Sequence, residues 1–148
     1  MREAIETTLV KDWMSSPVVS VSPITSIGNA HQILKERGIR RLPVIDRNKL
    51  VGIITIGDVR EASPSDATSL SIWELNYLWG QITVEKVMSR DVITVEPDAP
   101  IVEAARLMLE NKVSGLPVID PDSGAVVGIL TESDVFRMLV GAYDKTLA

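Results

Sequence analysis

The sequence predicts an α/β fold built from two copies of one βαββα unit. The first observation is an internal repeat: residues 14–23 (MSSPVVSVSP) recur as residues 88–97 (MSRDVITVEP), and LPVID occurs at 42–46 and at 116–120. The second is that β-rich and helical patterns follow one another in the same order in both copies. The third is that the offset between the copies is 74 residues for LPVID (42 to 116) and 76 for the next strand (51 to 127). The insertion lies within residues 120–124, a polar turn, as expected for two copies of one folded unit.

Each copy begins with a short β-rich segment followed by a helix. The first strands are expected at residues 18–21 and 92–95, each stopped by a proline, Pro23 or Pro97. The helix of the second copy carries an apolar stripe at i, i+3, i+4, i+7 and i+8: Ile101, Ala104, Ala105, Met108 and Leu109. The helix of the first copy places Ile27, Ala30, Ile33 and Leu34 on the matching face, and Gly38 is positioned to end it.

Two apolar strands and a last helix complete each copy. The strands are expected at residues 41–45 and 51–55, and again at 116–119 and 126–131. They are nearly continuous hydrophobic runs, so both faces of each should be covered, one of them by helices. The last helix of each copy should begin directly after Thr55 or Thr131. The predicted organisation is a first repeat over 9–62, a linker over 63–82, a second repeat over 83–141 and a C-terminal tail over 142–148.

The linker combines a polar segment with an aromatic helix. Residues 61–69 are polar and turn-rich, and residues 70–80 follow a helical pattern with Ser71 and Glu74 at capping-box spacing and Gly80 placed to end the helix. Most of the aromatic area of the chain lies here, in Trp73, Tyr77 and Trp79. We therefore expect the helix to pack on the core or on another subunit.

Composition limits the possible functions. The chain has no cysteine, hence no disulfide, no thiolate metal site and no thiol nucleophile. Its one histidine, His31, is expected to be a half-buried packing or subunit-interface residue, so no metal site is predicted. No apolar run reaches the roughly 20 residues that cross a bilayer, and the N-terminus lacks a signal-peptide pattern, so we expect a cytoplasmic protein without membrane contact. The net charge of −5 disfavours nucleic-acid binding.

Candidate functional residues recur at the end of the last strand. Thr55 and Asp58 in the first copy match Thr131 and Asp134 in the second. One interpretation is structural: Thr-x-x-Asp at a helix start is a capping pattern that stabilises by about 1 kcal/mol. The other is functional, because a carboxylate can accept two hydrogen bonds from a ribose diol and a helix N-terminus offers N–H groups to phosphate. The spacing is compatible with both.

Paired LPVID and G-I-[IL]-T-x-x-D segments, each preceded by M-S-x-x-V-x-x-V-x-P, resemble a tandem of cystathionine-β-synthase (CBS) domains, the Bateman module, of the bacterial stand-alone type. The resemblance covers residues 9–141. It implies two βαββα repeats packed with pseudo-twofold symmetry, their sheets facing each other across two clefts. In the family these clefts commonly bind adenosine ligands such as AMP, ADP, ATP or S-adenosylmethionine. Disk-like homodimers are usual.

The resemblance also implies which residues bind the ligand. Asp58 and Asp134 would hold the ribose hydroxyls, and Thr55 and Thr131 would contact ribose or phosphate. The adenine would lie against the first strands, near Val18, Val19 and Ser20 or near Val92, Ile93 and Thr94. The segment before each Leu-Pro pair would offer backbone groups, namely Ile39, Arg40, Arg41, Leu42 and Pro43 in one copy and Val113, Ser114, Gly115, Leu116 and Pro117 in the other.

The two implied sites differ in sequence. Ser114 and Gly115 occupy the positions of Arg40 and Arg41. Small residues let a base or ribose approach the backbone, whereas arginines narrow a cleft and can neutralise a phosphate. We therefore expect the Asp134 cleft to be the better nucleoside pocket. The cluster around Arg40 and Arg41 can also be read as a solvated helix end.

The sequence thus predicts a regulatory module without catalysis. It would sense an adenosine-containing nucleotide and transmit its binding by conformational change to a second copy or to an effector protein. No resident cofactor is expected, although ATP would bring Mg²⁺ with it. No catalytic constellation stands out in the sequence. The alternative is a nucleotide-free structural or interaction module that mediates dimerisation or partner binding, with Thr-x-x-Asp serving only as caps. The sequence identifies neither the ligand nor the partner.

Overall fold

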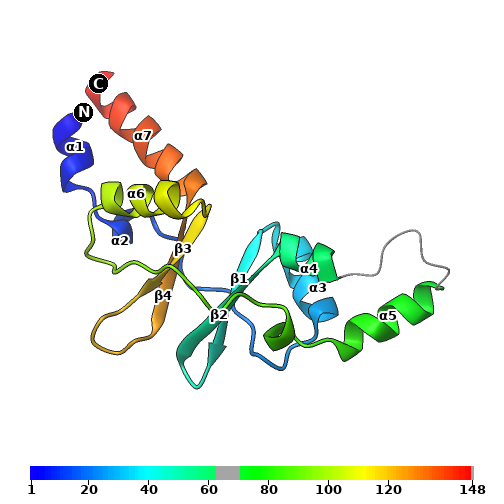
Figure 1. The fold of residues 1–148 in the computed structure, drawn as a ribbon. Coiled ribbons are helices and arrows are strands. Elements are labelled where there is room, and N and C mark those ends of the chain that lie inside the picture. The colour runs from blue at the N-terminus through cyan, green and yellow to red at the C-terminus, as the bar shows by residue number, and fades with distance from the viewer. Residues whose placement is uncertain (63–70, 148) are drawn as a thin grey trace. The chain divides into compact units, whose positions relative to one another are not determined.

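The computed structural model describes residues 1–62 and 71–147. The chain divides into two compact units, one formed by Met1–Val18 with Ile93–Ala148 and the other by Val19–Val92. Each unit contains one two-stranded antiparallel sheet together with helices (Figure 1). The α/β class predicted from the repeat is therefore confirmed.

The unit of residues 19–92 contains α3 (Ile27–Arg37), β1 (Arg41–Asp46), β2 (Lys49–Thr55), α4 (Ile56–Ala62), α5 (Ile72–Gln81) and the short 3-10 helix η1 (Val84–Lys86). Ser26 caps α3 by accepting a hydrogen bond from the Asn29 N–H at 3.1 Å. Gly38 ends α3 in the left-handed region, with φ 63°, as predicted. Arg47 and Asn48 form the tight turn of the hairpin, and both have the positive φ that a type I′ turn requires.

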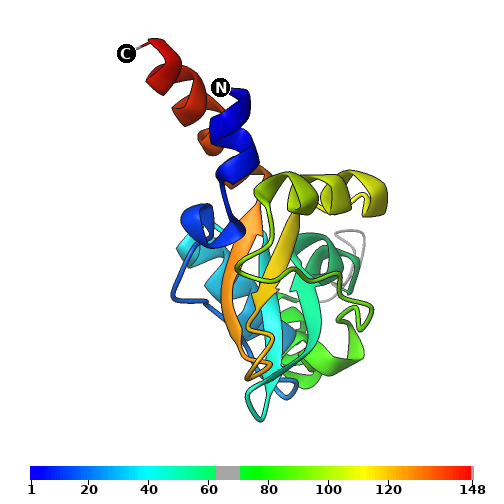
Figure 2. The same ribbon diagram turned by 90° about the vertical axis from the view of Figure 1, so that its left-hand side faces the viewer.

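The unit of residues 1–18 and 93–147 contains α1 (Arg2–Thr7), α2 (Val10–Trp13), α6 (Ile101–Asn111), β3 (Gly115–Ile119), β4 (Val126–Thr131) and α7 (Glu132–Leu147). Helices α1 and α7 lie side by side, so both ends of the chain belong to this unit (Figures 1 and 2). Lys112 ends α6 in the left-handed region, one residue beyond the expected Asn111. Helix α7 extends to Leu147 and so includes residues 142–147 of the predicted C-terminal tail, and residue 148 lies outside the described residues.

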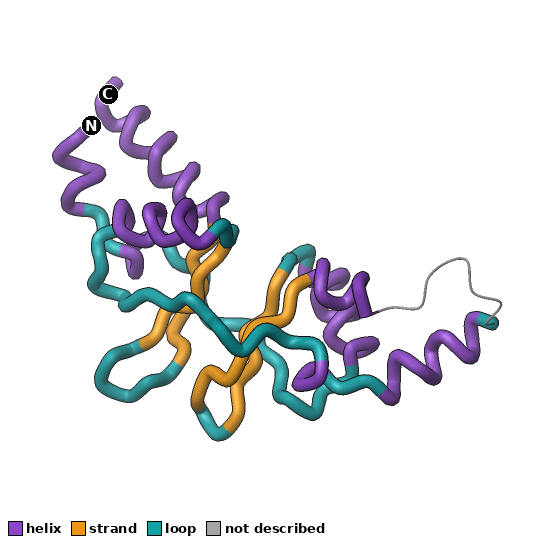
Figure 3. The backbone as a smooth tube through the Cα atoms, in the orientation of Figure 1, coloured by secondary structure: helices purple, strands orange, loops and turns teal. Residues whose placement is uncertain are grey.

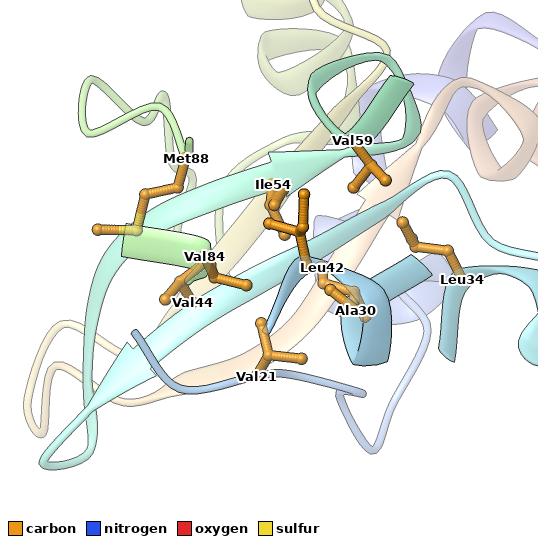
Figure 4. Close-up of a cluster of buried hydrophobic side chains, with 10 residues drawn as sticks. Val21, Ala30, Leu34, Leu42, Val44, Ile54, Val59, Val84 and Met88 are labelled. Atoms are coloured by element: carbon orange, nitrogen blue, oxygen red, sulfur yellow. The ribbon is translucent and has the colours of Figure 1, made fainter. Parts of the chain in front are cut away.

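Each unit has its own hydrophobic core. In residues 19–92 the sheet packs against α3, and Figure 4 shows Leu42, Val44 and Ile54 of the sheet gathered with Ala30 and Leu34 of the helix. In the other unit the corresponding core contains Val10, Ile101, Ala104, Leu116, Val118 and Leu130. Burial of each large aliphatic side chain contributes about 1.5–3 kcal/mol.

The first strand predicted for each copy is reduced to a single bridge. Val21 pairs in parallel with Val44, and Val95 with Val118, but no strand forms at 18–21 or 92–95, where Figure 3 shows loops. The boundary between the compact units falls inside both segments, at Val18/Val19 and at Val92/Ile93. Only the last residue of each segment therefore reaches the edge of a sheet.

The segment that precedes each bridge packs on the sheet of the other sequence copy. Ser15 exchanges two backbone hydrogen bonds with Ile129, at 2.9 and 3.1 Å, and Ser89 exchanges two with Ile53, both at 2.9 Å. A Cβ placed on Gly128 would lie 2.5 Å from Sδ of Met14, and one placed on Gly52 would lie 2.5 Å from Sδ of Met88. The predicted boundaries at 9–62 and 83–141 describe the duplication in the sequence, whereas each compact unit combines parts of both copies.

The linker helix α5 only partly meets the expectation of packing. Ser71 caps it by accepting the Glu74 N–H at 3.2 Å, as predicted, and the helix continues past Gly80 to Gln81. Trp79 packs against the core of residues 19–92, but Trp73 and Tyr77 are 80% and 67% exposed. Of the segment predicted as polar and turn-rich, residues 61 and 62 belong to α4, and residues 63–69 lie outside the described residues, as does residue 70.

Candidate ligand-binding site

The predicted Thr-x-x-Asp residues form two corners at which a strand passes directly into a helix. Strand β2 ends at Thr55 and α4 begins at the next residue, and β4 ends at Thr131 and α7 begins at the next residue. Asp58 and Asp134 therefore lie in the first turn of their helices. We call these the Asp58 corner and the Asp134 corner.

At the Asp58 corner the threonine and the aspartate cap each other. The Asp58 N–H donates to Oγ1 of Thr55 at 3.1 Å, and the Thr55 N–H donates to Oδ2 of Asp58 at 2.9 Å. This reciprocal pair is a capping box, so Thr55 and Asp58 cap the start of α4. The capping bond occupies only Oδ2, and the Asp58 side chain is partly exposed.

At the Asp134 corner the carboxylate is buried and more heavily bonded. Oδ2 accepts the Thr131 N–H at 2.9 Å and the Thr131 hydroxyl at 3.1 Å, and Oδ1 accepts a hydrogen bond from Nη1 of Arg137 at 2.9 Å. Asp134 is 4% exposed, and it is the one buried charged or polar residue within residues 1–62 and 71–145. A buried carboxylate is costly unless it is paired and hydrogen-bonded, and these three bonds supply that compensation.

The segment before each Leu-Pro pair lies beside the corner. Arg41 is the register partner of Thr55, and Gly115 is the partner of Thr131. The first N–H of α4 donates to the Arg40 carbonyl at 2.8 Å, and the first N–H of α7 donates to the Ser114 carbonyl at 3.0 Å. The first amide of each helix is therefore already bonded to protein and would not serve a phosphate.

The remaining predicted residues are distributed between the two units. Ser20 and Thr94 are exposed, and each precedes the valine whose N–H binds the Pro43 or Pro117 carbonyl at 3.1 Å. The Asp58 corner thus shares its unit with Ser20, Arg40, Arg41, Leu42, Pro43, Thr55 and Val92. The Asp134 corner shares its unit with Val18, Thr94, Val113, Ser114, Gly115, Leu116, Pro117 and Thr131.

The leucines and prolines of the predicted site are core residues. Leu42 and Leu116 have no exposed surface, and Pro43 and Pro117 are also buried. Their carbonyls and neighbouring amides are engaged in the parallel bridges to Val21 and Val95. A ligand contact at these positions would have to use the backbone.

The sequence prediction missed Arg137. The available signal was its position three residues after Asp134 on a helix, where side chains of opposite charge meet. The equivalent residue in the first copy, 76 positions earlier, is Glu61. The two corners therefore differ in the charge beside the aspartate as well as in the segment before Leu-Pro.

A second feature that the sequence did not reveal is a cavity of about 760 Å³ between α3 and α5. His31 and Trp79 line it with their rings 5.0 Å apart, and His31 Nδ1 and Trp79 Nε1 are buried without a hydrogen-bond partner. None of the predicted ligand-binding residues lines this cavity.

Among residues 1–62 and 71–147, no group of three or more histidine, aspartate or glutamate side chains is placed to hold a metal ion. Over the same residues, no helix is both long and apolar enough to cross a membrane.

The family model of the CBS domain matches residues 10–65 and 84–141 of the sequence. The chain belongs to the CBS domain family. Its two matched stretches cover both sequence copies and both corners. One relative is the L-aspartate semialdehyde sulfurtransferase of Methanocaldococcus jannaschii, 37% identical over 135 residues, which is 90% of this chain and 24% of that enzyme. The chain spans about a quarter of the length of the first curated relatives it matches.

Solved structures of CBS domain pairs are similar along nearly the whole chain. The CBS domain pair of protein MJ0100, in complex with 5′-methylthioadenosine and S-adenosyl-L-methionine, is 37% identical with a TM-score of 0.75, covering 92% of this chain and 98% of that chain. CBSX2 in complex with AMP is 33% identical with a TM-score of 0.74, covering 91% of this chain and 98% of that chain. All three of these ligands contain adenosine or a 5′-thio derivative of it.

Proposed function

We propose that this chain is a regulatory module that binds an adenosine-containing ligand at its Thr-x-x-Asp corners and performs no chemical reaction itself. The observation that carries the proposal is a carboxylate held in the first turn of a helix by an adjacent threonine, with an oxygen outside the capping bond at Asp58. Two similar CBS domain pairs were solved with adenosine-type ligands, and this supports the same ligand class here.

The corner residues have distinct roles in this proposal. Asp58 and Asp134 accept hydrogen bonds from the ribose hydroxyls, as carboxylates do in nucleotide-binding folds. Arg40 and Arg41 neutralise phosphates of a nucleotide bound at the Asp58 corner. At the Asp134 corner, Gly115 lets the ligand approach the backbone closely.

The residues next to Leu-Pro complete the proposed contacts. Ser20 and Thr94 are exposed beside the bridges and would face the base. Val18, Val92 and Val113 would give apolar contacts, whereas Ser114 would offer its hydroxyl.

Transmission of binding would use the helices that begin at the corners. Helix α7 carries exposed apolar side chains along its length, namely Phe136, Leu139, Val140 and Tyr143. Exposed apolar surface of this kind marks interaction sites. A ligand at Asp134 therefore binds the first turn of the helix that we propose as the surface for a second copy or an effector protein.

Thermal melting with adenosine, AMP, ADP, ATP and S-adenosylmethionine tests the proposal. A ligand present at 100 times its dissociation constant stabilises the folded chain by about 2.7 kcal/mol. Asp58→Ala and Asp134→Ala should each reduce the shift, whereas Glu110→Ala, an exposed acidic residue of α6, should leave it unchanged. GMP serves as the control that keeps the ribose and phosphate but changes the base. Absence of any shift with millimolar adenosine compounds would contradict the proposal.

The alternative is an interaction module that binds no nucleotide. The complete capping box at Thr55 and Asp58 favours it, because the motif already has a structural role. In that case no adenosine compound would change the melting temperature, and sedimentation would still show self-association through the apolar face of α7.

A further inference from the structure

We propose that Arg137 competes with the ligand for the Asp134 carboxylate, so that the Asp134 corner fills only after Arg137 leaves, whereas the Asp58 corner needs no such release. This inference rests on the proposed binding of a ribose diol at both corners. It concerns the order in which they fill and assigns a regulatory role to a residue outside the Thr-x-x-Asp motif.

The hydrogen-bonding capacity of the two carboxylates carries the inference. Each carboxylate oxygen accepts about two hydrogen bonds. At Asp134, Oδ2 already accepts two donors from Thr131 and Oδ1 accepts Arg137, so a single acceptor position is left on Oδ1. A diol that binds through both hydroxyls needs two positions. One of the present donors must therefore leave.

Arg137 is the donor that can leave. The two Thr131 donors are a backbone amide at the end of β4 and the hydroxyl of the same residue, both held by the strand. The Arg137 side chain is 66% exposed while that of Asp134 is 6% exposed, so the guanidinium can turn into solvent. An incoming ribose hydroxyl would then replace the guanidinium as the partner of Oδ1.

Among residues 1–62 and 71–147, the Asp58 corner has no counterpart of this Arg137 bond. The residue at the position of Arg137 is Glu61, an exposed side chain of the wrong charge to pair with a carboxylate. With respect to the described residues, the capping bond uses one acceptor position on Oδ2 of Asp58 and leaves positions for both hydroxyls of a diol. The same motif therefore leaves the Asp58 carboxylate able to bind a ribose diol, whereas the Asp134 carboxylate is bonded to Arg137 of its own helix.

The Arg137 bond should weaken ligand binding at the Asp134 corner, whereas the small residues before Leu116 should strengthen it. Ser114 and Gly115 favour close approach of a nucleoside to the Asp134 corner, whereas Arg137 raises the ligand concentration needed to fill it. Binding at Asp134 exchanges a charged guanidinium for a neutral ribose hydroxyl, so part of the binding free energy is used to break the ion pair and a higher ligand concentration is needed. We therefore expect two binding steps, the first at Asp58.

Calorimetric titration with adenosine isolates the effect, because adenosine has the diol but no phosphate. In an Asp58→Ala background only the Asp134 corner is left. There, Arg137→Ala should tighten adenosine binding about tenfold, and Arg106→Ala, which removes the same charge from the exposed face of α6, should leave it unchanged. In an Asp134→Ala background, Glu61→Arg should weaken adenosine binding at Asp58, and Glu61→Gln should not.

A second measurement guards against loss of folding in the Arg137 variant, since Asp134 is buried. The side-chain NMR signals of Arg137 in the unsubstituted chain should shift on addition of adenosine as the ion pair breaks. A purely structural arginine would keep its signals at saturation, which would overturn the inference.

The outcomes also separate this inference from the proposed function. Adenosine binding at the Asp134 corner with equal affinity in the presence and absence of Arg137 would refute the competition and leave the proposed function intact. If neither adenosine nor AMP bound to any of these variants or to the unsubstituted chain, the proposed function would be wrong and the competition with it. Binding at the Asp134 corner that is detected only after Arg137→Ala would support both.

Discussion

Replacing Gly128 with alanine tests whether the N-terminal segment packs on the sheet of the second copy. The new Cβ would lie 2.5 Å from Sδ and 2.9 Å from Cγ of Met14, and 3.1 Å from the carbonyl oxygen of Ser15. Carbon atoms in contact are separated by about 3.5–4.0 Å, so the Met14 side chain must move by roughly an ångström. Ser15 cannot retreat freely, because two backbone hydrogen bonds tie it to Ile129.

The expected loss of stability follows from two opposing effects. Overpacking of this kind costs about 1–3 kcal/mol. Alanine also restricts the unfolded chain, which stabilises by about 0.4–1 kcal/mol. Gly128→Ala should therefore lower the free energy of unfolding by about 0–2.6 kcal/mol, with a central value of about 1.3 kcal/mol, measured by urea denaturation. In a thermal melt, each 1 kcal/mol corresponds to about 4–8 °C for a unit of this size.

A double-mutant cycle identifies the partner of Gly128. Met14→Ala removes the atoms that clash, so it should cost less in the Gly128→Ala background than in the unsubstituted chain. Met88→Ala is the matched control, because Met88 lies against Gly52. Coupling of Gly128 to Met88 rather than to Met14 would show that each segment packs on its own copy and would refute the exchange.

Three further predictions address local contacts. The pKa of Asp120 lies below its ordinary value because the Ser123 hydroxyl and the Asp122 N–H donate to its carboxylate. The stabilisation that these bonds give is present above the unfolded-state pKa of about 4 and is lost as the pH falls through the lower pKa of the folded state. Ser123→Ala removes one donor, so it should raise the pKa of Asp120 in an NMR titration, and an unchanged midpoint would contradict this. Thr131→Val should destabilise more than Thr55→Val, which should cost about 1 kcal/mol, because only Thr131 donates its hydroxyl to a buried carboxylate; equal losses on urea denaturation would argue against it. Leu116→Ala, at a position without exposed surface, should cost about 2–5 kcal/mol in the same assay, and a loss below 1 kcal/mol would contradict its place in the core.

Local patterns predicted the helices and hairpins because their determinants are close in sequence. Ser26 and Gly38 bound α3, and Ser71 caps α5, through contacts that span three or four residues. The hairpin strands were predictable from apolar runs around polar turns. The Thr-x-x-Asp corners were predictable for the same reason, since every bond of the Thr55 cap joins residues three apart.

The exchange of segments could not be predicted from the repeat. Met14 and Met88 are equivalent in the two copies, and so are Gly52 and Gly128. Each methionine would fit against either glycine equally well on sequence grounds. The choice depends on the path of the chain at Val18 and Val92, where the predicted strands break as the chain passes from one unit to the other.

The two corners differ at two places, and only one of these differences could be predicted from the sequence. One difference between the copies is evident from the sequence, because it lies next to the LPVID motif: Ser114 and Gly115 replace Arg40 and Arg41. Arg137 against Glu61 falls on a helix surface, where a charged residue usually has no specific partner. Arg137 has a specific partner because Asp134 is buried and its carboxylate needs a hydrogen-bond donor. The two duplicated corners have therefore diverged through a residue outside the shared motif, and in the proposed competition this surface residue sets which corner fills first.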